Sequence, residues 1–293
     1  MVGAKFGAID LQGINLSDKD LSGCSFEGAN LSNANLCNTN LRNCNLRNAN
    51  LINANIRGVC FEGAMLSEIT LNWKVFFARV SNKKLKKALI ALTKPNASIT
   101  EIILNSQNLG DKEASLIAMA LKVNSTLIGL NLESNNIGDQ GATSLADALR
   151  TNSTLKELHL TENKIGDQGT TSLAEALRTN CTLTWLGLER NNIGDKGLMS
   201  IAETLRTNST LTTLNLDGNQ IGNQGATSWA EALQTNCTLT TVWLGSNNID
   251  DQGATRIAEA LRINSTLKYL CLQCNKIKLQ RRLSTEFERR AYF

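Results

Sequence analysis

The chain has 293 residues, of which 42% are hydrophobic but only 4% are aromatic, and it contains a single proline. It has no run of about 18 apolar residues and no apolar signal-peptide core at its start, so we expect a cytoplasmic protein without a membrane span. Its charge is uneven, because residues 69–95 hold seven basic and no acidic groups, whereas residues 96–275 hold 12 basic and 18 acidic groups. An acidic array of this length argues against an extended nucleic-acid surface.

A large apolar residue recurs every five positions through the first part of the chain. These positions are Phe6, Leu11, Leu16, Leu21, Phe26, Leu31, Leu36, Leu41, Leu46, Leu51, Ile56, Phe61 and Leu66. A mostly small residue, such as Ala29 or Cys44, stands two positions earlier, and Asn commonly stands one position earlier. Internal repeats at a fixed period indicate a solenoid. The pattern resembles the pentapeptide-repeat family, A-[DN]-L-x-x.

A period of five fits neither an α-helix nor a flat strand. It predicts a square coil with one pentapeptide on each of four faces, in which the large and the small residue both point inward. The resemblance implies that residues 1–68 form a short all-β coil, a right-handed quadrilateral β-helix of about three turns. Both ends of such a coil expose backbone groups and need covering.

Residues 69–95 are expected to be a basic linker that caps the two repeat arrays. The segment begins with the apolar residues Trp73, Val75, Phe76 and Phe77. Lys83 to Leu92 predicts an amphipathic helix, and Pro95 ends it. The lysines of Lys83–Lys87 could contact an anionic membrane or RNA, but the pattern favours a solvated cap helix, since short runs of positive charge are common and nonspecific.

A second period, of 28 residues, begins after the linker. Its repeats start at Asn96, Asn124, Asn152, Asn180, Asn208, Asn236 and Asn264. In the second repeat, Leu127, Leu130 and Leu132 predict a short strand with inward side chains. The apolar residues from Leu145 to Leu149 follow helical spacing and predict a helix with a buried stripe. Each repeat is therefore expected to be a strand, a turn, a helix and a turn.

This repeat resembles the ribonuclease-inhibitor type of leucine-rich repeat. It is most similar to the repeats of NOD-like immune receptors, with related versions in Ran GTPase activators and tropomodulins. The resemblance covers residues 96–275 and implies an α/β solenoid with a curved parallel sheet inside and helices outside. A helical stripe at Leu279, Leu283 and Phe287 suits a terminal cap, so the leucine-rich-repeat domain is expected to span residues 96–293.

Four framework positions of the repeat have predictable physical roles. Asn135 is expected to be buried and to satisfy the backbone groups freed where the strand turns. Asp139 is expected to be the N-cap of the helix, and Gly141 to allow close approach to a neighbouring backbone. Asn152 is expected to end the helix in the left-handed conformation.

The residues give little support to catalysis, and no cofactor or metal is expected. His159 is the only histidine, and no G-x-x-x-x-G-K-[ST] motif is present. The recurring I-G-D-x-G occurs once per repeat, which favours a structural role over a phosphate loop. Cys271 and Cys274 form a single C-x-x-C pair, which cannot complete a zinc site. The eight cysteines are expected to be reduced.

Variable strand residues on the concave side of the arc are the candidates for function. They are Glu101, Ile103, Asn131, Glu133, Glu157, His159, Trp185, Glu189, Arg190, Asn215, Asp217, Trp243, Tyr269 and Cys271. Exposed aromatic residues ringed by carboxylates are typical of an interface hot spot. We therefore predict a partner-binding site made of Glu133, His159, Trp185, Glu189, Arg190, Asp217, Trp243 and Tyr269. Trp229 instead occupies a helix position equivalent to Leu145, which predicts a packing role.

The expected function is that of a non-enzymatic, monomeric scaffold that binds a basic and partly apolar protein surface. The resemblance to NOD-like receptors implies signalling or innate-immune-type regulation. One alternative is GTPase activation of the Ran-activator type. Another is the DNA mimicry by which some pentapeptide proteins inhibit topoisomerases. That mimicry needs a long acidic rod, whereas this coil is short and carries Arg42, Arg47 and Arg57 outward.

Overall fold

The computed structural model describes residues 2–61, 63–66, 69–71, 77, 80–94, 98–278 and 291–292. The chain forms two compact units, Met1–Ile99 with Leu116–Ser125, and Thr100–Ser115 with Thr126–Phe293. Several residues of the expected caps lie outside the described residues, namely Trp73, Val75, Phe76, Pro95, Leu279, Leu283 and Phe287. Within the described part of the chain, no helix combines the length and the hydrophobicity needed to cross a membrane.

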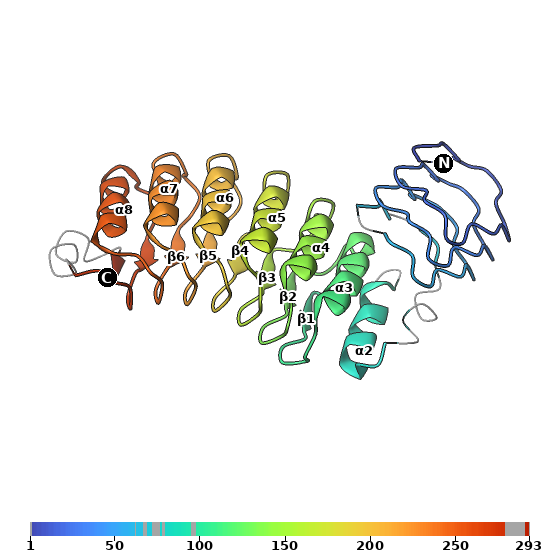
Figure 1. Cartoon of the computed structure of the whole chain (residues 1–293), viewed down its shortest axis with the longest axis horizontal. Coiled ribbons are helices and arrows are strands. Elements are labelled where there is room, and N and C mark those ends of the chain that lie inside the picture. Colours follow the sequence, from blue (N-terminus) through green and yellow to red (C-terminus); the bar gives the residue numbers. More distant parts are fainter. Residues whose placement is uncertain are drawn as a thin grey trace. The chain divides into compact units, whose positions relative to one another are not determined.

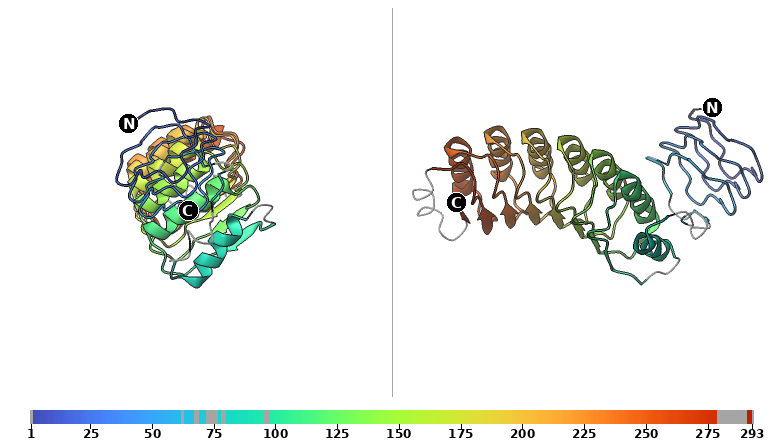
Figure 2. Two further views of the ribbon diagram at one scale, coloured as in Figure 1. Left: turned by 90° about the vertical axis from the view of Figure 1, so that its right-hand side faces the viewer. Right: turned by 60° about the horizontal axis from the view of Figure 1, so that its bottom comes forward.

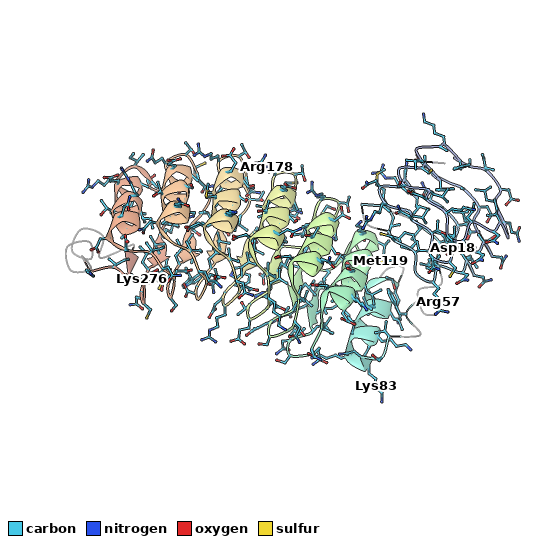
Figure 3. All side chains as sticks on the ribbon, in the orientation of Figure 1. Asp18, Arg57, Lys83, Met119, Arg178 and Lys276 are labelled. Carbon is cyan, nitrogen blue, oxygen red and sulfur yellow. The ribbon has the colours of Figure 1, made fainter. Side chains whose placement is uncertain are left out.

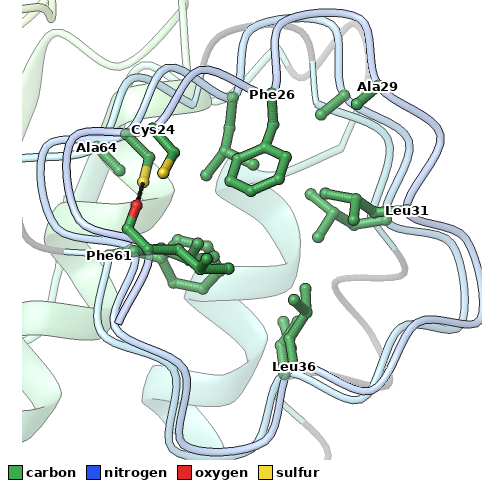
Figure 4. Packing of buried hydrophobic residues seen from close by; sticks show 14 of the residues in the cluster. Cys24, Phe26, Ala29, Leu31, Leu36, Phe61 and Ala64 are labelled. Carbon is green, nitrogen blue, oxygen red and sulfur yellow. Dashed lines mark hydrogen bonds between the residues drawn. The ribbon is translucent and has the colours of Figure 1, made fainter. Parts of the chain in front are cut away.

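The first unit contains the pentapeptide coil. Parallel β-bridges join residues that are 20 positions apart, from Lys5 and Ser25 to Asn50 and Thr70, so each turn of the coil holds four pentapeptides. Figure 4 shows Phe26, Leu31, Leu36 and Phe61 pointing into the interior from different sides, with the smaller Cys24, Ala29 and Ala64 beside them. The square coil predicted from the period is confirmed.

The asparagines of the coil lie outside its core and form ladders along it. The Asn50 Nδ2 donates to Asn30 Oδ1 (3.1 Å), and the Asn30 Nδ2 donates to Asp10 Oδ1 (2.8 Å). Other turn positions carry a positive φ, as at Asn33 (60°) and Gly28 (68°). Glycine and asparagine tolerate this conformation best, which explains their recurrence two residues after the apolar position.

One helix of the leucine-rich repeats contributes its second half to the first unit. Met119 and Val123, in the second half of α3 (Asp111–Val123), pack against the coil's hydrophobic core. The Lys122 ammonium donates to the Ala64 carbonyl (3.2 Å). Residues that the sequence assigns to the first leucine-rich repeat thus help to cover the end of the coil.

The amphipathic helix expected in the basic segment is confirmed as α2 (Lys83–Leu92). It buries Leu85, Leu89 and Leu92, and its N-cap, Asn82, accepts a hydrogen bond at Oδ1 from the Leu85 amide (2.9 Å). The side chains of Lys83, Lys84 and Lys87 are exposed. Figure 3 shows Lys83 pointing away from the helix.

The second unit is an arc of strand–helix repeats. Its strands form one parallel sheet in sequential order, and the helices cover one side of it (Figure 1). Figure 2 shows the strands on the inner, concave face and the helices on the outer face. Besides α2 and α3, the elements are β1 (Glu101–Ile103), β2 (Gly129–Asn131), α4 (Asp139–Leu149), β3 (Glu157–His159), α5 (Asp167–Leu177), β4 (Trp185–Gly187), α6 (Asp195–Leu205), β5 (Thr213–Asn215), α7 (Asn223–Leu233), β6 (Thr241–Trp243), α8 (Asp251–Ile263), β7 (Tyr269–Cys271) and β8 (Ala291–Tyr292).

The buried asparagine of each repeat satisfies the backbone as predicted. In the third repeat, the Asn163 Nδ2 donates to the carbonyls of Leu132 (3.0 Å) and Leu160 (3.1 Å). Its Oδ1 accepts from the Ile137 amide of the preceding repeat (2.9 Å). Asn135, Asn191, Asn219 and Asn247 make the equivalent bonds. This internal ladder fastens each turn to its neighbour.

The prediction that Asp139 is the N-cap of its own helix is wrong. Gly138 occupies the N-cap of α4 without a side-chain bond, and Asp139 is the first helical residue. Its Oδ1 instead accepts from the amides of Gly166 (2.7 Å) and Gly169 (2.9 Å) in the next repeat. The stacking of repeats brings each aspartate beside the unpaired N–H groups at the start of the following helix.

Gly141 allows a close approach, but the nearest atoms belong to side chains and not, as predicted, to a neighbouring backbone. A Cβ atom there would lie 2.7 Å from both Asp111 Oδ1 and Ile137 Cγ2. The prediction that Asn152 adopts the left-handed conformation is wrong, because its φ is not positive. Asn152 is buried, and its Oδ1 accepts from the amides of Thr154 (3.1 Å) and Leu155 (2.9 Å). The asparagine that begins each repeat therefore supports the turn before the strand.

Two further features concern packing and the sheet edge. Trp229 is fully buried, so its predicted packing role is confirmed. The short strand β8 pairs in parallel with β7, through Leu270 with Ala291 and Cys271 with Tyr292. The repeat pattern did not predict this strand, which follows the edge of β7 and pairs backbone groups that would otherwise remain open.

Candidate functional site

The concave side of the sheet carries side chains that differ from repeat to repeat. The central residue of each strand from β1 to β7 is buried, whereas the first residue of each is at least partly exposed. Register aligns the first residues in one column, so Glu101 lies beside Gly129, and Gly129 beside Glu157. We call the first and third residues of β1–β7, together with the accessible residues that follow each strand, the strand face.

Trp185 packs closely onto the strand face. Its ring lies over Gly187, where a Cβ atom would be 2.5 Å from Cη2 and Cζ3 of the indole. The ring centroid is 3.9 Å from that of His159, with an interplanar angle of 31°. The expectation of a freely exposed aromatic is therefore wrong for Trp185, which is half-buried because glycine leaves room for its ring.

A second aromatic pair lies two strands further along. The rings of Trp243 and Tyr269 are 5.6 Å apart between centroids and inclined at 52°. Both residues are half-buried rather than exposed, which again corrects the expectation. Cys271 pairs in register with Trp243 and is buried, and this burial raises the pKa of its thiol. The three side chains form the most apolar part of the strand face.

Arg190 is already paired within the strand face. Its Nη1 donates to Glu162 Oε1 (2.5 Å), and its Nε lies 3.6 Å from Glu189 Oε1. The hydrogen bond with Glu162 raises the pKa of Arg190, while hydrogen bonds from Ser134 and Arg190 lower the pKa of Glu162. The Glu189 Oε2 also accepts from Asn215 Nδ2 (3.0 Å). The middle of the strand face is thus a self-paired polar network.

Asp217 lies between this network and the second aromatic pair. Its Oδ1 accepts from the Gly245 amide (2.5 Å). Burial raises the pKa of its carboxyl above the ordinary value, and the nearby charge of Glu189 acts in the same direction. Asp217 is therefore held by the backbone of the next repeat, and its carboxylate is only partly accessible.

Accessible carboxylates gather at the other end of the strand face. Glu101 and Glu157 are exposed on β1 and β3, and Glu133 is half-buried beyond β2. The Glu157 Oε2 lies 3.7 Å from His159 Nε2. A cavity of about 410 Å³ opens in this region and is lined by Thr100, Glu101, Ile128, Gly129, Leu130, Asn131, Glu157 and His159. The strand face therefore has an acidic end and an aromatic end.

The structure divides the predicted site residues into groups. It brings together His159 with Trp185, Glu189 with Arg190, and Trp243 with Tyr269. Glu133 and Asp217 belong to different parts of the face and make no common cluster. The predicted site omitted Glu162, Gly129, Glu101 and Glu157. Aligning the first strand positions of all repeats would have pointed to Gly129, since it alone there lacks a side chain.

The helix side of the arc carries ion pairs between repeats. Arg150 Nη2 lies 3.1 Å from Glu175 Oε2, and Arg206 Nη2 lies 3.0 Å from Glu231 Oε2. Arg178 points outward from the helix side in Figure 3. Exposed pairs of this kind contribute little to stability, about 0–1 kcal/mol each. This face repeats its composition from helix to helix and offers no comparable aromatic cluster among the described residues.

Within the described ranges, the cysteines and acidic residues form neither a metal site nor a paired thiol site. No group of three or more His, Cys, Asp or Glu side chains in these ranges is placed to hold a metal ion. Cys271 is buried in β7, whereas Cys274 is exposed in a turn with a φ of 60°. The C-x-x-C pair thus occupies two different environments.

Comparisons with protein families identify both repeat types. The TMOD/LMOD leucine-rich domain matches residues 48–189, and the leucine-rich repeat matches residues 179–202, 207–228 and 235–258. Pentapeptide repeats, in eight copies, match residues 1–36. No curated protein shows significant similarity to the chain.

Three solved structures are among those similar to parts of the chain. Leiomodin-1 actin-binding site 2 is 25% identical, with a TM-score of 0.40, over 44% of this chain and 77% of that one. A pentapeptide repeat protein from Nostoc Pcc 7120 is 25% identical, with a TM-score of 0.19, over 24% and 78%. The protein Rfr23 from Cyanothece 51142 is 32% identical, with a TM-score of 0.17, over 25% and 60%. At these TM-scores, none of the likenesses bears on what this chain binds. The chain combines an N-terminal run of pentapeptide repeats with leucine-rich repeats.

Proposed function

We propose that the chain is a non-enzymatic scaffold whose strand face binds a protein partner. The observation that supports this best is the pair Trp243 and Tyr269, half-buried side by side where the repeat framework has no use for aromatic residues. Aromatic side chains bury a large area at low entropic cost and dominate many protein interfaces. The match to a leucine-rich domain family supports a binding role of this kind.

The partner we propose has a basic and partly apolar surface. The aromatic end of the strand face offers the apolar contact, and Glu101, Glu133 and Glu157 offer negative charge. Complementary charge accelerates association at low salt and disfavours wrong partners. By resemblance to NOD-like receptors, the proposal extends to a signalling or immune-type regulatory role for a monomer in the cytoplasm.

Two other functions receive less support. GTPase activation would need polar residues on the repeat loops, and none can be assigned that role from the geometry. DNA mimicry would need a continuous acidic surface on the coil. Figure 3 shows Arg57 and Asp18 both on the outside of the coil, and Arg42 and Arg47 are exposed there as well. The surface charge of the coil is mixed in sign.

An affinity-capture experiment tests the proposal. The full chain is immobilised, and proteins retained from a lysate are compared with those retained by Trp243→Ala, Trp185→Ala and the helix-side control Arg178→Ala. We expect either tryptophan substitution to weaken binding of the partner at least about tenfold, which corresponds to about 1.4 kcal/mol. Arg178→Ala should leave the affinity unchanged. Circular dichroism establishes that each variant is folded. A partner that ignores both tryptophans and is lost with Arg178→Ala would disprove the proposed surface.

A further inference from the structure

Gly129 is a glycine that the backbone does not require. Its φ lies outside the left-handed region, and a Cβ atom there would meet only Glu101 Cγ, at an ordinary contact distance of 3.6 Å. Gly187 differs, because a Cβ there would collide with the Trp185 ring. One glycine of the strand face is thus filled by a tryptophan of its own strand, whereas the other leaves an open space.

The open space is the cavity of about 410 Å³ between β1 and β3. Its floor is the backbone of Gly129 and Leu130, and one wall is Ile128, which is 39% exposed. Cavities of about 300–1,000 Å³ are large enough to enclose most of a small ligand. This one can therefore take a long side chain together with some of the backbone that carries it.

The polar groups of the cavity favour a cation. Glu101 and Glu157 flank Gly129 in the register of the sheet, one on each side. Arg190, the cation of the polar network in the middle of the strand face, pairs instead with Glu162 and Glu189. His159 also lines the cavity, and its ring packs against the ring of Trp185. Two carboxylates beside the exposed side chain of Ile128 suit an aliphatic stem with a charged head.

We propose that this cavity, which we call the Gly129 pocket, receives an arginine or lysine side chain of the protein partner. This proposal rests on the proposed function and names the contact at the acidic end of the strand face. The aliphatic stem lies against Ile128 and the backbone of Gly129, and the charged head lies between Glu101 and Glu157. The carboxylates would repel the phosphates of nucleic acid, so the occupant is a protein side chain.

The distance to the aromatic end sets the spacing of the partner's anchors. From β2 to β6 there are four strand spacings of about 4.8 Å, or about 19 Å across the sheet. An extended peptide advances about 3.3 Å per residue, so about six residues span this distance. The partner is therefore an extended segment with a basic residue about six positions from an apolar or aromatic residue that contacts Trp243 and Tyr269.

A phage-displayed library of random 16-residue peptides, selected on the intact full chain, is the probe. Selected sequences should be enriched in a basic and an apolar residue about six positions apart. The best sequence is then synthesised with arginine or lysine at the basic position, and with citrulline, which has the shape of arginine without its charge. We expect citrulline to reduce affinity for the wild-type chain at least tenfold.

A double-mutant cycle locates the contact. On Glu101→Gln/Glu157→Gln, the exchange of arginine for citrulline should change affinity less than twofold. Glu175→Gln/Glu203→Gln, which removes the same charge from the helix side, should retain the full tenfold effect. Gly129→Leu fills the pocket without changing charge and should weaken the arginine peptide at least tenfold, with folding checked by circular dichroism.

The outcomes separate this proposal from the proposed function. Selected peptides that depend on Trp243 but keep the citrulline effect in Glu101→Gln/Glu157→Gln would overturn the Gly129 pocket alone. Peptides without an enriched basic residue would overturn it equally. If selection on the wild-type chain enriches nothing relative to Trp243→Ala, the proposed function fails, and the pocket proposal fails with it.

Discussion

The coil and the arc both repeat an asparagine, but they use it in opposite places. In the coil, Asn35 lies at the surface and joins its neighbours side chain to side chain, through Asn15 (3.0 Å) and Asn55 (2.9 Å). In the arc, Asn191 is buried and bonds to backbone, including the Leu160 carbonyl (2.9 Å) and the Ile165 amide (3.0 Å). Water can replace a lost hydrogen-bond partner at the surface but not in the buried core. The buried asparagine therefore contributes more to the free energy of unfolding than the surface one.

The difference follows from how each solenoid turns its corners. The coil closes each corner with backbone bonds between successive turns, such as Leu31 N to Asn50 O (2.8 Å). Its asparagine side chains lie outside the core, where they pair with one another and accept from the amide two residues later, as Asn35 Oδ1 does from Cys37 N (3.3 Å). The arc must bend the chain between a strand and a helix, which frees backbone groups inside the molecule. A buried amide has both the donor and the acceptor needed to satisfy them.

The largest expected effect tests this contrast directly. Asn191→Ala leaves at least two buried backbone groups without partners, at about 1–3 kcal/mol each, so we expect a loss of about 2–6 kcal/mol. Asn35→Ala removes surface bonds and should cost about 1 kcal/mol. Urea denaturation of the full chain, followed by circular dichroism, measures both. Equal losses would show that position inside or outside the solenoid does not matter.

A second prediction concerns coupling between repeats in the arc. Leu186 and Leu270 are both fully buried central strand residues, one in the middle of the array and one near its end. Truncation to alanine should cost about 2–5 kcal/mol, and more for Leu186 because terminal repeats fray more readily. Denaturation midpoints decide the order. A larger loss for Leu270→Ala would indicate that β8 holds the last repeat more firmly than expected.

The smallest effects should have opposite signs in the two regions. Burial raises the pKa of Asp217 in the arc above its ordinary value of 3.8, whereas hydrogen bonds from Ser22 lower the pKa of Asp20 in the coil. A raised carboxyl pKa means that the folded state holds the proton more tightly, so stability falls as pH rises through that pKa. A lowered pKa means that stability is present at neutral pH and falls as pH drops below about 3.8.

Substitution by asparagine distinguishes the two carboxylates. Asp217→Asn keeps an acceptor for the Gly245 amide and removes the buried charge, so it should leave the chain at least as stable at pH 7 and reduce the decline in stability above pH 4. Asp20→Asn should lower stability slightly at pH 7 and have a smaller effect at pH 3. Thermal unfolding at pH 3, 4, 5 and 7 tests both variants. Shifts of the same sign at pH 7 would contradict this assignment.

The repeat periods predicted much of this architecture because each repeat buries the same positions. Leu130 and Leu158 both lie at the centre of a strand, and their burial follows from the pattern alone. The burial of Asn163 and its bond to the Leu160 carbonyl follow from its own strand and turn, whereas its bonds to Leu132 and Ile137 of the preceding repeat depend on stacking. The helix at Lys83–Leu92 was predictable because its apolar spacing fixes the buried side.

The arrangement of the strand face was harder to predict. The sequence identified Trp185 and Trp243 as unusual, but it presented them as exposed residues among carboxylates. Their half-burial depends on what stands two positions away or in the next strand, namely Gly187, His159 and Tyr269. Arg190 was included as a partner-binding residue, although Glu162 and Glu189 already pair with it. The partner-binding role of the predicted residues remains a prediction.

The sequence by itself determined the two repeat types, the buried framework and the residues that vary on the strands. Only the tertiary structure decided that Asp139 supports the helix of the next repeat and that Gly129 opens a pocket between two glutamates. The physical reason is distance along the chain. A period specifies what each residue does within its own repeat, but these contacts join residues about 28 positions apart, and only stacking brings them together.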